Sequence, residues 1–393
     1  AKLNILSKIR TILALGVINI LREVSYKFTI KLGLHPVTRL KSKPSKGPFF
    51  LLPLTINETL PSNSSWNKNI WFFGWLKVPI PKATPNWFEN KFSQKLQPDN
   101  SYDWWRIPDF ETGDIKGLWE LSRFDWVAAW ATEAAKGNSS TLKNLNIWLE
   151  NWSQENPPYK GPNWKCGQEA SIRVMHLVTA SWILSQDENP QTGLIEIISS
   201  HLQRIVPTIH YAIGQQNNHG TSEAAALFIG GSFLLGIDRR AKSWVEVGRF
   251  WLEDRANKLI SEDGSFSQYS VNYHRLMLDS YSLAEAWRAH RNLSPFSKQL
   301  IAKLQAATIW LEILTNDENG DAPNIGANDG ARLLQLIDSN YRDFRPSVQL
   351  AAALFDKRDV YGHGPWNAPL GWLNVKMGAR KSKIESYSFN DGG

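Results

Sequence analysis

Two polar clusters in the sequence carry residue types that acid–base chemistry requires. The first is Gln-Gln-Asn-Asn-His at residues 215–219, shortly before the apolar residues 224–229. This pattern is typical of a helix start, with Thr221 or Ser222 as the expected N-cap. Asn218 and His219 are then expected just ahead of the positive helix end, a position that suits an anion. The alternative for this cluster is a solvated helix-capping loop.

The second cluster spans residues 262–275 and contains a turn followed by an extended polar run. Gly264 allows the turn, and the run delivers Tyr273 and His274 to the start of the next predicted helix. A phenol or an imidazole at such a place can take or give a proton. The alternative is a long loop whose tyrosines are half-buried packing residues.

Other familiar signatures are absent from the sequence. It contains no Gly-Lys dipeptide and no His followed by Glu, which excludes a P-loop and a zincin motif. Asp317, Asn319 and Asp321 have the spacing of a calcium loop, but Ala322 stands where glycine is needed and Asn328 where the bidentate glutamate belongs. The loop is therefore not expected to bind calcium.

From residue 117 onward, an apolar period of about 3.6 predicts a series of helices joined by short loops. The expected helices cover residues 117–136, 141–152, 167–185, 194–214, 221–236, 240–260, 274–291, 296–314 and 346–355. No strict repeat of 34 or 42 residues appears, which argues against the common helical solenoids. A closed or nearly closed ring of helical hairpins is the favoured architecture.

The two ends of the chain depart from this pattern. Residues 2–32 have the period of an amphipathic helix, and residues 35–100 are rich in Pro, Ser and Asn, with a strand-like run at 49–54. Residues 371–393 lose the helical period, and residues 385–389 alternate like a strand. We therefore expect a basic helix and irregular arm over 1–100, a helical domain over 101–370, and a linker with the first strand of a truncated β-domain over 371–393.

The net charge of +7 is concentrated at the N-terminus. Residues 1–50 hold ten Lys or Arg and one acid, whereas the other 343 residues hold 34 basic and 36 acidic side chains. A nucleic-acid enzyme would spread its cations along a binding face, so nucleic acid is not an expected partner. Residues 1–30 instead suggest contact with an acidic surface or a membrane. The alternative is a helix packed on the main body.

Composition places the chain among ordinary globular proteins. Of its 393 residues, 42% are hydrophobic and 21% charged, which excludes a disordered or collagen-like chain. No apolar run reaches the roughly 18 residues of a membrane span. The single cysteine, Cys166, excludes an internal disulfide. The 19 tryptophans include core residues, but tryptophan is also a surface on which sugar rings stack.

Taken together, five segments resemble the heparinase II/III family of polysaccharide lyases in order and approximate spacing. They are residues 118–124 (Leu-Trp-Glu-Leu-Ser-Arg-Phe), the stretch from Asn163-Trp164 to Arg173, Asn217-Asn218-His219 with Glu223, residues 263–266, and Tyr273-His274. The resemblance covers roughly residues 100–393. It implies an all-α fold class, an incomplete α/α toroid of helical hairpins preceded by the basic helical arm, with the start of a β-sandwich at the C-terminus.

The resemblance also implies roles for individual residues. Asn218 and His219 match the family's carboxylate-neutralising pair, and Tyr273 matches its catalytic tyrosine. The family's aspartate is replaced by Ala327, so its role is lost or shifted to Asp329. The sandwich, where some members hold a metal, is missing, and no cofactor is expected in this fragment. Substrate contacts are expected from Trp119, Glu120, Arg123, Trp164, Arg173, Asn217, Glu223, His274 and Arg275.

A uronic-acid lyase removes the proton at carbon 5 and expels the oxygen at carbon 4. Donors aimed at the carboxylate stabilise the developing enolate. Tyrosine, with a pKa of about 10, is a poor base unless cations favour its ionised form, and His274 and Arg275 are the nearest in sequence. The expected partner is an acidic polysaccharide, and the expected location is the periplasm or cell envelope, although nothing in the sequence rules out the cytoplasm.

Two alternatives remain open. A glycoside hydrolase on the same toroid would need two carboxyl groups about 5 to 10 Å apart. The available acids are Glu120, Asp125, Glu169, Glu223, Asp263 and Asp329. The other alternative is a non-catalytic module that binds acidic glycans. The sequence does not specify the polymer, the mode of cleavage or the oligomeric state.

Overall fold

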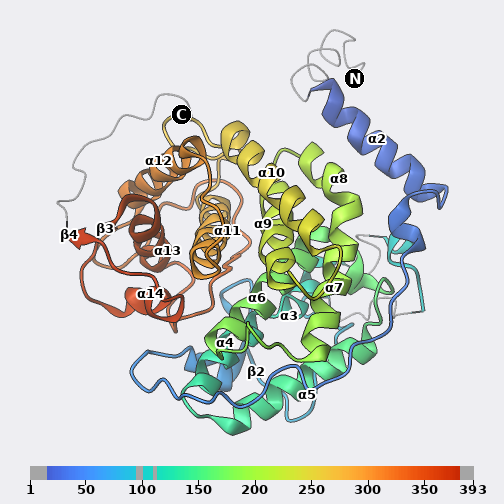
Figure 1. Ribbon diagram of the computed structural model, residues 1–393, viewed down its shortest axis with the longest axis horizontal. Helices are drawn as coiled ribbons and strands as arrows, with labels where there is room; N and C mark the ends of the chain where they lie inside the picture. The colour runs from blue at the N-terminus through green and yellow to red at the C-terminus, as the bar shows by residue number, and fades with distance from the viewer. Residues whose placement is uncertain (1–15, 94–100, 109–112, 381–393) are drawn as a thin grey trace.

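Helical hairpins arranged around a ring form most of the protein (Figure 1). The structure, a computed structural model, describes residues 16–93, 101–108 and 113–380. The four hairpins pair α4 (Asp125–Ala135) with α5 (Ser139–Glu155), α6 (Gly167–Ile183) with α7 (Thr192–Ile205), α9 (Asn218–Phe233) with α10 (Ala241–Leu259), and α11 (Val271–His290) with α12 (Lys298–Leu314). This arrangement confirms the predicted all-α fold class.

The first helix of each hairpin packs against the first helix of the next, so that α4, α6, α9, α11 and α13 (Arg345–Ala351) form an inner layer. Their hairpin partners lie outside. An inner helix is covered on nearly all sides, and every residue of α9 except His219 is buried. Close packing depends on small residues: a Cβ added at Gly248 of α10 would lie 2.4 Å from the backbone nitrogen of Phe228 in α9. This is the inner and outer layering of an α/α toroid.

Three predicted helices are interrupted in the structure. The helix predicted at 117–136 breaks at Phe124, which has a φ of 67°, into α3 (Lys116–Ser122) and α4. The helix predicted at 194–214 breaks at a 3-10 turn, Val206–Thr208, because Pro207 has no N–H to donate, and α8 (Ile209–Gly214) follows. After α13 the chain continues as a π-helical segment, Ala352–Asp356, before α14 (Ala368–Trp372).

Strands are few in the described residues and are not where the sequence predicted one. β1 (Asn69–Phe72) and β2 (Leu76–Pro79) form an antiparallel hairpin, and β3 (Arg358–Asp359) pairs in parallel with β4 (Ala379–Arg380). The strand expected at 49–54 is wrong: the N–H groups of Phe49 and Phe50 donate to Oδ1 of Asn146 in α5 instead of to a neighbouring strand. The strand expected at 385–389 lies outside the described residues.

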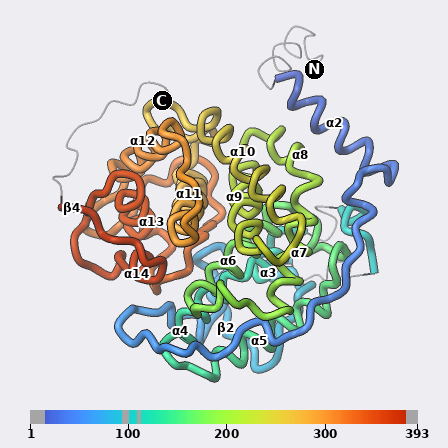
Figure 2. The backbone as a smooth tube through the Cα atoms, in the orientation of Figure 1, coloured from blue at the N-terminus to red at the C-terminus, as the bar shows by residue number. Residues whose placement is uncertain are grey.

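The arm closes the ring where helical hairpins do not. It leaves α2 (Val17–Lys31), passes α7 and α5, and reaches the gap between α4 and α13 (Figure 2). There, Asn63 Nδ2 donates to the carbonyl of Gln335 at 3.1 Å, and Trp372 Nε1 donates to that of Pro61 at 2.8 Å. The turn after β1 contacts the loop that carries Gly330. Residues more than 250 positions apart in sequence thus complete the ring.

Most tryptophans belong to the core. Trp126 contacts the rings of Trp87, Trp130 and Trp148, with centroids 5.2 to 6.2 Å apart. Short 3-10 turns connect the larger elements at Pro36–Arg39, Ser64–Asn67, Trp104–Arg106, Pro162–Trp164 and Pro365–Asn367. Among the described residues, no helix is both long and apolar enough to cross a bilayer.

Candidate functional site

The first polar cluster forms the N-terminal turn of α9. Asn217 is the N-cap, and its Oδ1 accepts the backbone N–H of His219 at 3.0 Å. The N-cap predicted at Thr221 or Ser222 is therefore wrong. Asn218 and His219 lie within the first turn rather than ahead of it, and Gln268 Oε1 accepts the N–H of Asn218 at 2.8 Å. The second polar cluster thus holds the first in place.

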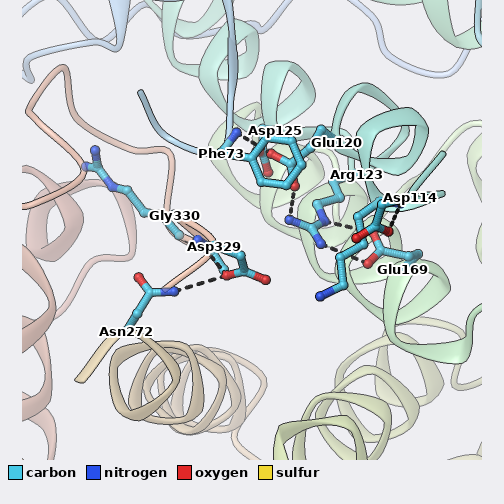
Figure 3. Close-up of polar contacts among 12 residues, drawn as sticks. Phe73, Asp114, Glu120, Arg123, Asp125, Glu169, Asn272, Asp329 and Gly330 are labelled. Carbon is cyan, nitrogen blue, oxygen red and sulfur yellow. Dashed lines mark hydrogen bonds and ion pairs between the residues drawn. The ribbon is translucent and has the colours of Figure 1, made fainter. Parts of the chain in front are cut away.

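Tyr273 lies in the first turn of α11, whose N-cap is Ser270. Its hydroxyl donates to Oδ2 of Asp329 at 2.9 Å, and Asn272 Nδ2 donates to Oδ1 of the same carboxylate at 3.2 Å. Figure 3 shows Asn272 and Asp329 on the side of the site opposite Arg123. Burial and the neighbouring Asp329 charge raise the pKa of Tyr273 above its usual value. The phenol is therefore protonated at neutral pH.

The cations nearest to Tyr273 in sequence do not contact its phenol. His274 Nε2 lies 2.9 Å from the carbonyl oxygen of Ala307, and the ring stacks on Trp310. Arg275 donates to the carbonyl of Ala331 at 2.8 Å and to Oδ1 of Asn272 at 2.9 Å. Arg275 therefore positions the segment next to Asp329, while His274 is a packing residue.

Across from Asp329, Arg123 is held between two glutamates (Figure 3). Arg123 Nε and Nη2 donate to the two carboxylate oxygens of Glu169 at 2.8 and 3.0 Å, and Nη1 pairs with Glu120. The second oxygen of Glu120 accepts the N–H of Phe73 at 2.6 Å. Both carboxyl groups are thus engaged by donors from the protein itself, and the pair of Arg123 with Glu169 has the bidentate geometry typical of arginine.

Electrostatics link the two sides of this site. Arg123, Glu169 and Asp329 all influence the pKa of His219 and that of Tyr273. Burial, the largest effect, lowers the pKa of His219 to about 4, so the imidazole is neutral at neutral pH. Within residues 16–93, 101–108 and 113–380, the side-chain nitrogens of Asn218 and His219 make no hydrogen bond. Their donors are available to a substrate.

A cavity of about 450 Å³ adjoins this cluster. Glu120, Arg123 and Gly330 line it, together with aromatic side chains that include Trp71, Trp75 and Tyr341. Asn218, His219 and Tyr273 are not among its lining residues, but Gly330, which is one of them, directly follows Asp329, the acceptor of the Tyr273 hydroxyl. A cavity with aromatic walls and fixed charges is suited to a charged sugar.

Four of the expected substrate-binding residues make contacts inside the protein. Trp119 and Trp164 donate their indole N–H groups to the carbonyls of Pro162 and Asn156. Arg173 is fully buried and donates to His201 Nε2 at 2.8 Å. Glu223 packs against Gly167 at the start of α6, where a Cβ would lie 2.4 Å from its Oε1. All four side chains are buried.

The structure adds residues that the sequence analysis did not single out for the site. Asn272 and Gln268 were inside the second cluster, but only their contacts to Asp329 and Asn218 show what they do. Arg332 also lines the cavity, 207 residues after Asp125, which the sequence offered only as an acid for the hydrolase alternative. Asp125 comes directly after the segment 118–124 that carries the family resemblance.

The inner and outer layers of helices, closed by the arm, define an α/α toroid domain. The family model described as the heparinase II/III N-terminus matches residues 82–345, more than half of the chain. The chain therefore belongs to the heparinase II/III family. No curated protein matches the chain.

Solved structures of heparinase III and heparan sulfate lyase have limited similarity to this chain. A heparinase III structure has 16% identity and a TM-score of 0.46, covering 81% of this chain and 50% of its own. Heparan sulfate lyase HepC from Pedobacter heparinus has 20% identity and a TM-score of 0.39, covering 66% and 43%. The heparinase III BT4657 gene product has 15% identity and a TM-score of 0.43, covering 86% and 51%. This chain spans about half the length of these structures, and similarity at this level does not extend to substrate.

Proposed function

We propose that this chain is the helical catalytic domain of a lyase that cleaves a uronic-acid-containing polysaccharide by β-elimination. The observation that carries the proposal is the hydrogen bond between the Tyr273 hydroxyl and Asp329, beside the unpartnered donors of Asn218 and His219. Membership of the heparinase II/III family supports the reaction class.

Asn218 and His219 would bind the uronate carboxylate. The Asn218 amide and the neutral His219 imidazole each offer an N–H, and both lie in the first turn of α9, where the helix dipole favours negative charge. Negative charge builds on the carboxylate as the carbon 5 proton leaves. Each preorganised donor would then contribute about 3 to 4 kcal/mol to transition-state stabilisation.

Tyr273 would move the protons. Its oxygen takes the carbon 5 proton while its own proton passes to Asp329, to which it is already hydrogen-bonded at 2.9 Å. No free phenolate is then required, which matters because the pKa of Tyr273 is raised. Tyr273 next gives a proton to the oxygen at carbon 4 as that bond breaks, and Asp329 returns its proton to the phenol. The products are a free hydroxyl and a sugar with a 4,5 double bond.

The contacts of four of the six candidate carboxyl groups do not favour the hydrolase alternative. Hydrolysis needs one protonated and one ionised carboxyl group flanking the sugar bond. Glu120 and Glu169 are both engaged by Arg123, and Glu223 is buried against α6. Asp329 is the carboxylate closest to the proposed chemistry, and it is bonded to the phenol.

The test is turnover of a panel of uronate polymers by the full-length protein, followed by the ultraviolet absorbance of the new double bond. Tyr273→Phe keeps the ring and should lower turnover at least about 100-fold while leaving polymer binding almost unchanged. Tyr281→Phe is the matched control. Tyr281 lies in the same helix as Tyr273, but its hydroxyl donates to the carbonyl of Leu252 in α10. The variant should lower stability by about 1 kcal/mol and leave turnover intact. Saturated products, or full activity of Tyr273→Phe, would contradict the proposal.

A further inference from the structure

Helix α2 (Val17–Lys31) packs on the body of the protein through its more polar face. It lies at the edge of the molecule against α8 (Figure 1). The ring of Tyr26 stacks on that of Tyr211 with centroids 4.0 Å apart, and the Arg22 guanidinium lies 5.7 Å from the ring centre of Trp251. These contacts hold the helix in one orientation.

The opposite face of α2 is apolar and exposed. Its side chains recur at spacings of three and four residues, which places them in one stripe along the helix. The stripe consists of Val17, Leu21, Val24, Phe28 and Leu32, each 51% to 62% exposed, with Ile18 beside it at 67%. A helix whose only role is to pack on the body would turn such a stripe inward. Here the structure turns it to solvent, and a contiguous apolar patch of this kind marks an interaction surface.

Exposed cations lie along one edge of this stripe and on the arm that follows α2. Residues 17–50 hold seven Lys or Arg and one acid, Glu23. Lys27 and Lys31 lie one turn apart beside the stripe and are exposed. Four more cations of the arm are exposed as well: Arg39, Lys41, Lys43 and Lys46. A second copy of this chain would bring the same cations together and be repelled, whereas an anionic surface would be attracted.

We propose that α2 docks on an anionic lipid surface, with the apolar stripe entering the boundary between headgroups and acyl chains. Lys27 and Lys31 would then contact the headgroups. Fifteen residues make a helix about 22 Å long, which lies in the interface rather than across the membrane. The face that binds lipid is opposite Tyr26, so docking leaves the contact with α8 intact. The docked protein would hold its catalytic ring next to the membrane.

The experiment is flotation of the whole chain with vesicles of phosphatidylcholine containing about 30% phosphatidylserine, compared with phosphatidylcholine alone. Wild type should bind the anionic vesicles and bind the neutral ones much more weakly. Leu21→Ser with Phe28→Ser should lower the partition coefficient at least about tenfold, because two buried apolar side chains are lost. Lys27→Gln with Lys31→Gln should lower it about tenfold at low salt and much less at high salt.

The matched control is Leu52→Ser with Leu54→Ser. These leucines are 58% and 104% exposed but lie on the arm beyond α2, so the variant should bind vesicles like wild type. The proposal is overturned if the α2 stripe variant binds as well as wild type, or if neutral and anionic vesicles bind equally. It is also overturned if sedimentation shows a lipid-free dimer that the stripe variant converts to monomer, since the stripe would then be an interface between copies. Turnover of short oligosaccharides should be the same in all variants.

Discussion

Asp329 determines what Tyr273 can do. The aspartate lies 56 residues after the tyrosine, and the loop places its carboxylate 2.9 Å from the phenol oxygen. Burial is the main cause of the raised pKa of Tyr273, and the Asp329 charge raises it further; Asp329 also accepts the hydrogen bond along which that proton would leave. Its neighbour Asn272 holds the other carboxylate oxygen and so fixes the orientation.

Asp329→Asn tests this role. The amide oxygen can still accept the phenol hydrogen bond but cannot take the proton, so turnover at neutral pH should fall at least about 100-fold with little change in polymer binding. Removing the negative charge should lower the pKa of Tyr273, so the remaining activity should rise more steeply with pH than that of wild type. The measurement is the pH profile of kcat for both proteins. Asp321→Asn, at an exposed ion pair with Arg342, should change neither quantity. If the pH profile of kcat for Asp329→Asn runs parallel to that of wild type, Asp329 does not take part in the proton transfer.

The buried carboxyl group of Glu223 should make the free energy of unfolding depend on pH. Its carboxyl is buried with Oε2 unpaired among the described atoms, and burial raises its pKa to about 8. In the unfolded chain it would ionise near pH 4.5, so the folded form holds the extra proton between these values. The stabilisation is complete below about pH 4.5 and is lost as the pH rises toward 8.

Glu223→Gln should therefore lose less stability than wild type between pH 5 and pH 8.5. At about 1.4 kcal/mol per unit of pKa shift, the difference amounts to a few kcal/mol. It can be measured from denaturant unfolding at both pH values. Equal losses in the two proteins would show that the Glu223 carboxyl ionises normally in the folded state.

At the scale of the element, the N-terminal turn of α9 couples stability to catalysis. Asn217 caps the helix, and the same turn presents Asn218 and His219. Asn217→Ala should lower the free energy of unfolding by about 1 kcal/mol and also lower turnover, because the two donors lose their fixed backbone.

The matched control for Asn217→Ala is Asn138→Ala. Asn138 caps α5 in the same way, with its Oδ1 accepting the N–H of Thr141 at 3.1 Å, but no residue of the site lies in that turn. Asn138→Ala should lower the free energy of unfolding by a similar amount and leave turnover unchanged. If both variants lose turnover equally, the effect of Asn217 is one of general stability.

At the scale of the whole molecule, the contact between the arm and the loop that carries Asp329 closes the ring. Gly330 has a φ of 70°, and a Cβ there would lie 1.7 Å from the carbonyl oxygen of Phe73. Gly330→Ala must displace either the β1–β2 turn or the loop, so we expect a loss of about 3 kcal/mol or more and strongly reduced turnover.

Gly236→Ala separates backbone strain from ring closure. Gly236 has a φ of 81°, but nothing lies within 4 Å of an added Cβ. This variant should lose only about 1 kcal/mol and keep its turnover. The measurement is thermal unfolding together with turnover for both variants. Equal losses of stability and turnover in the two variants would show that the contact between the arm and the loop contributes to neither.

The helices of the ring and the two polar clusters at helix starts were predictable from sequence. Apolar residues with a period of 3.6 must be buried along one side, and this constraint is local, so the helix positions were predictable within a few residues. Breaks at Phe124 and Pro207 were missed because apolar side chains continue across them. The N-cap at Asn217 was missed because Thr221 and Ser222 are equally good capping residues by type.

The contacts between groups distant in sequence depend on the tertiary fold. Asp329 bonds to Tyr273, Glu169 to Arg123 and the turn after β1 to Glu120, across 46 to 56 residues of intervening sequence. These partners depend on how the hairpins pack around the ring, which no local pattern encodes. For α2, the sequence showed an apolar stripe but not what it faces, since periodicity is the same whether the stripe meets protein or solvent. Packing on α8 through Tyr26 decided that it faces outward.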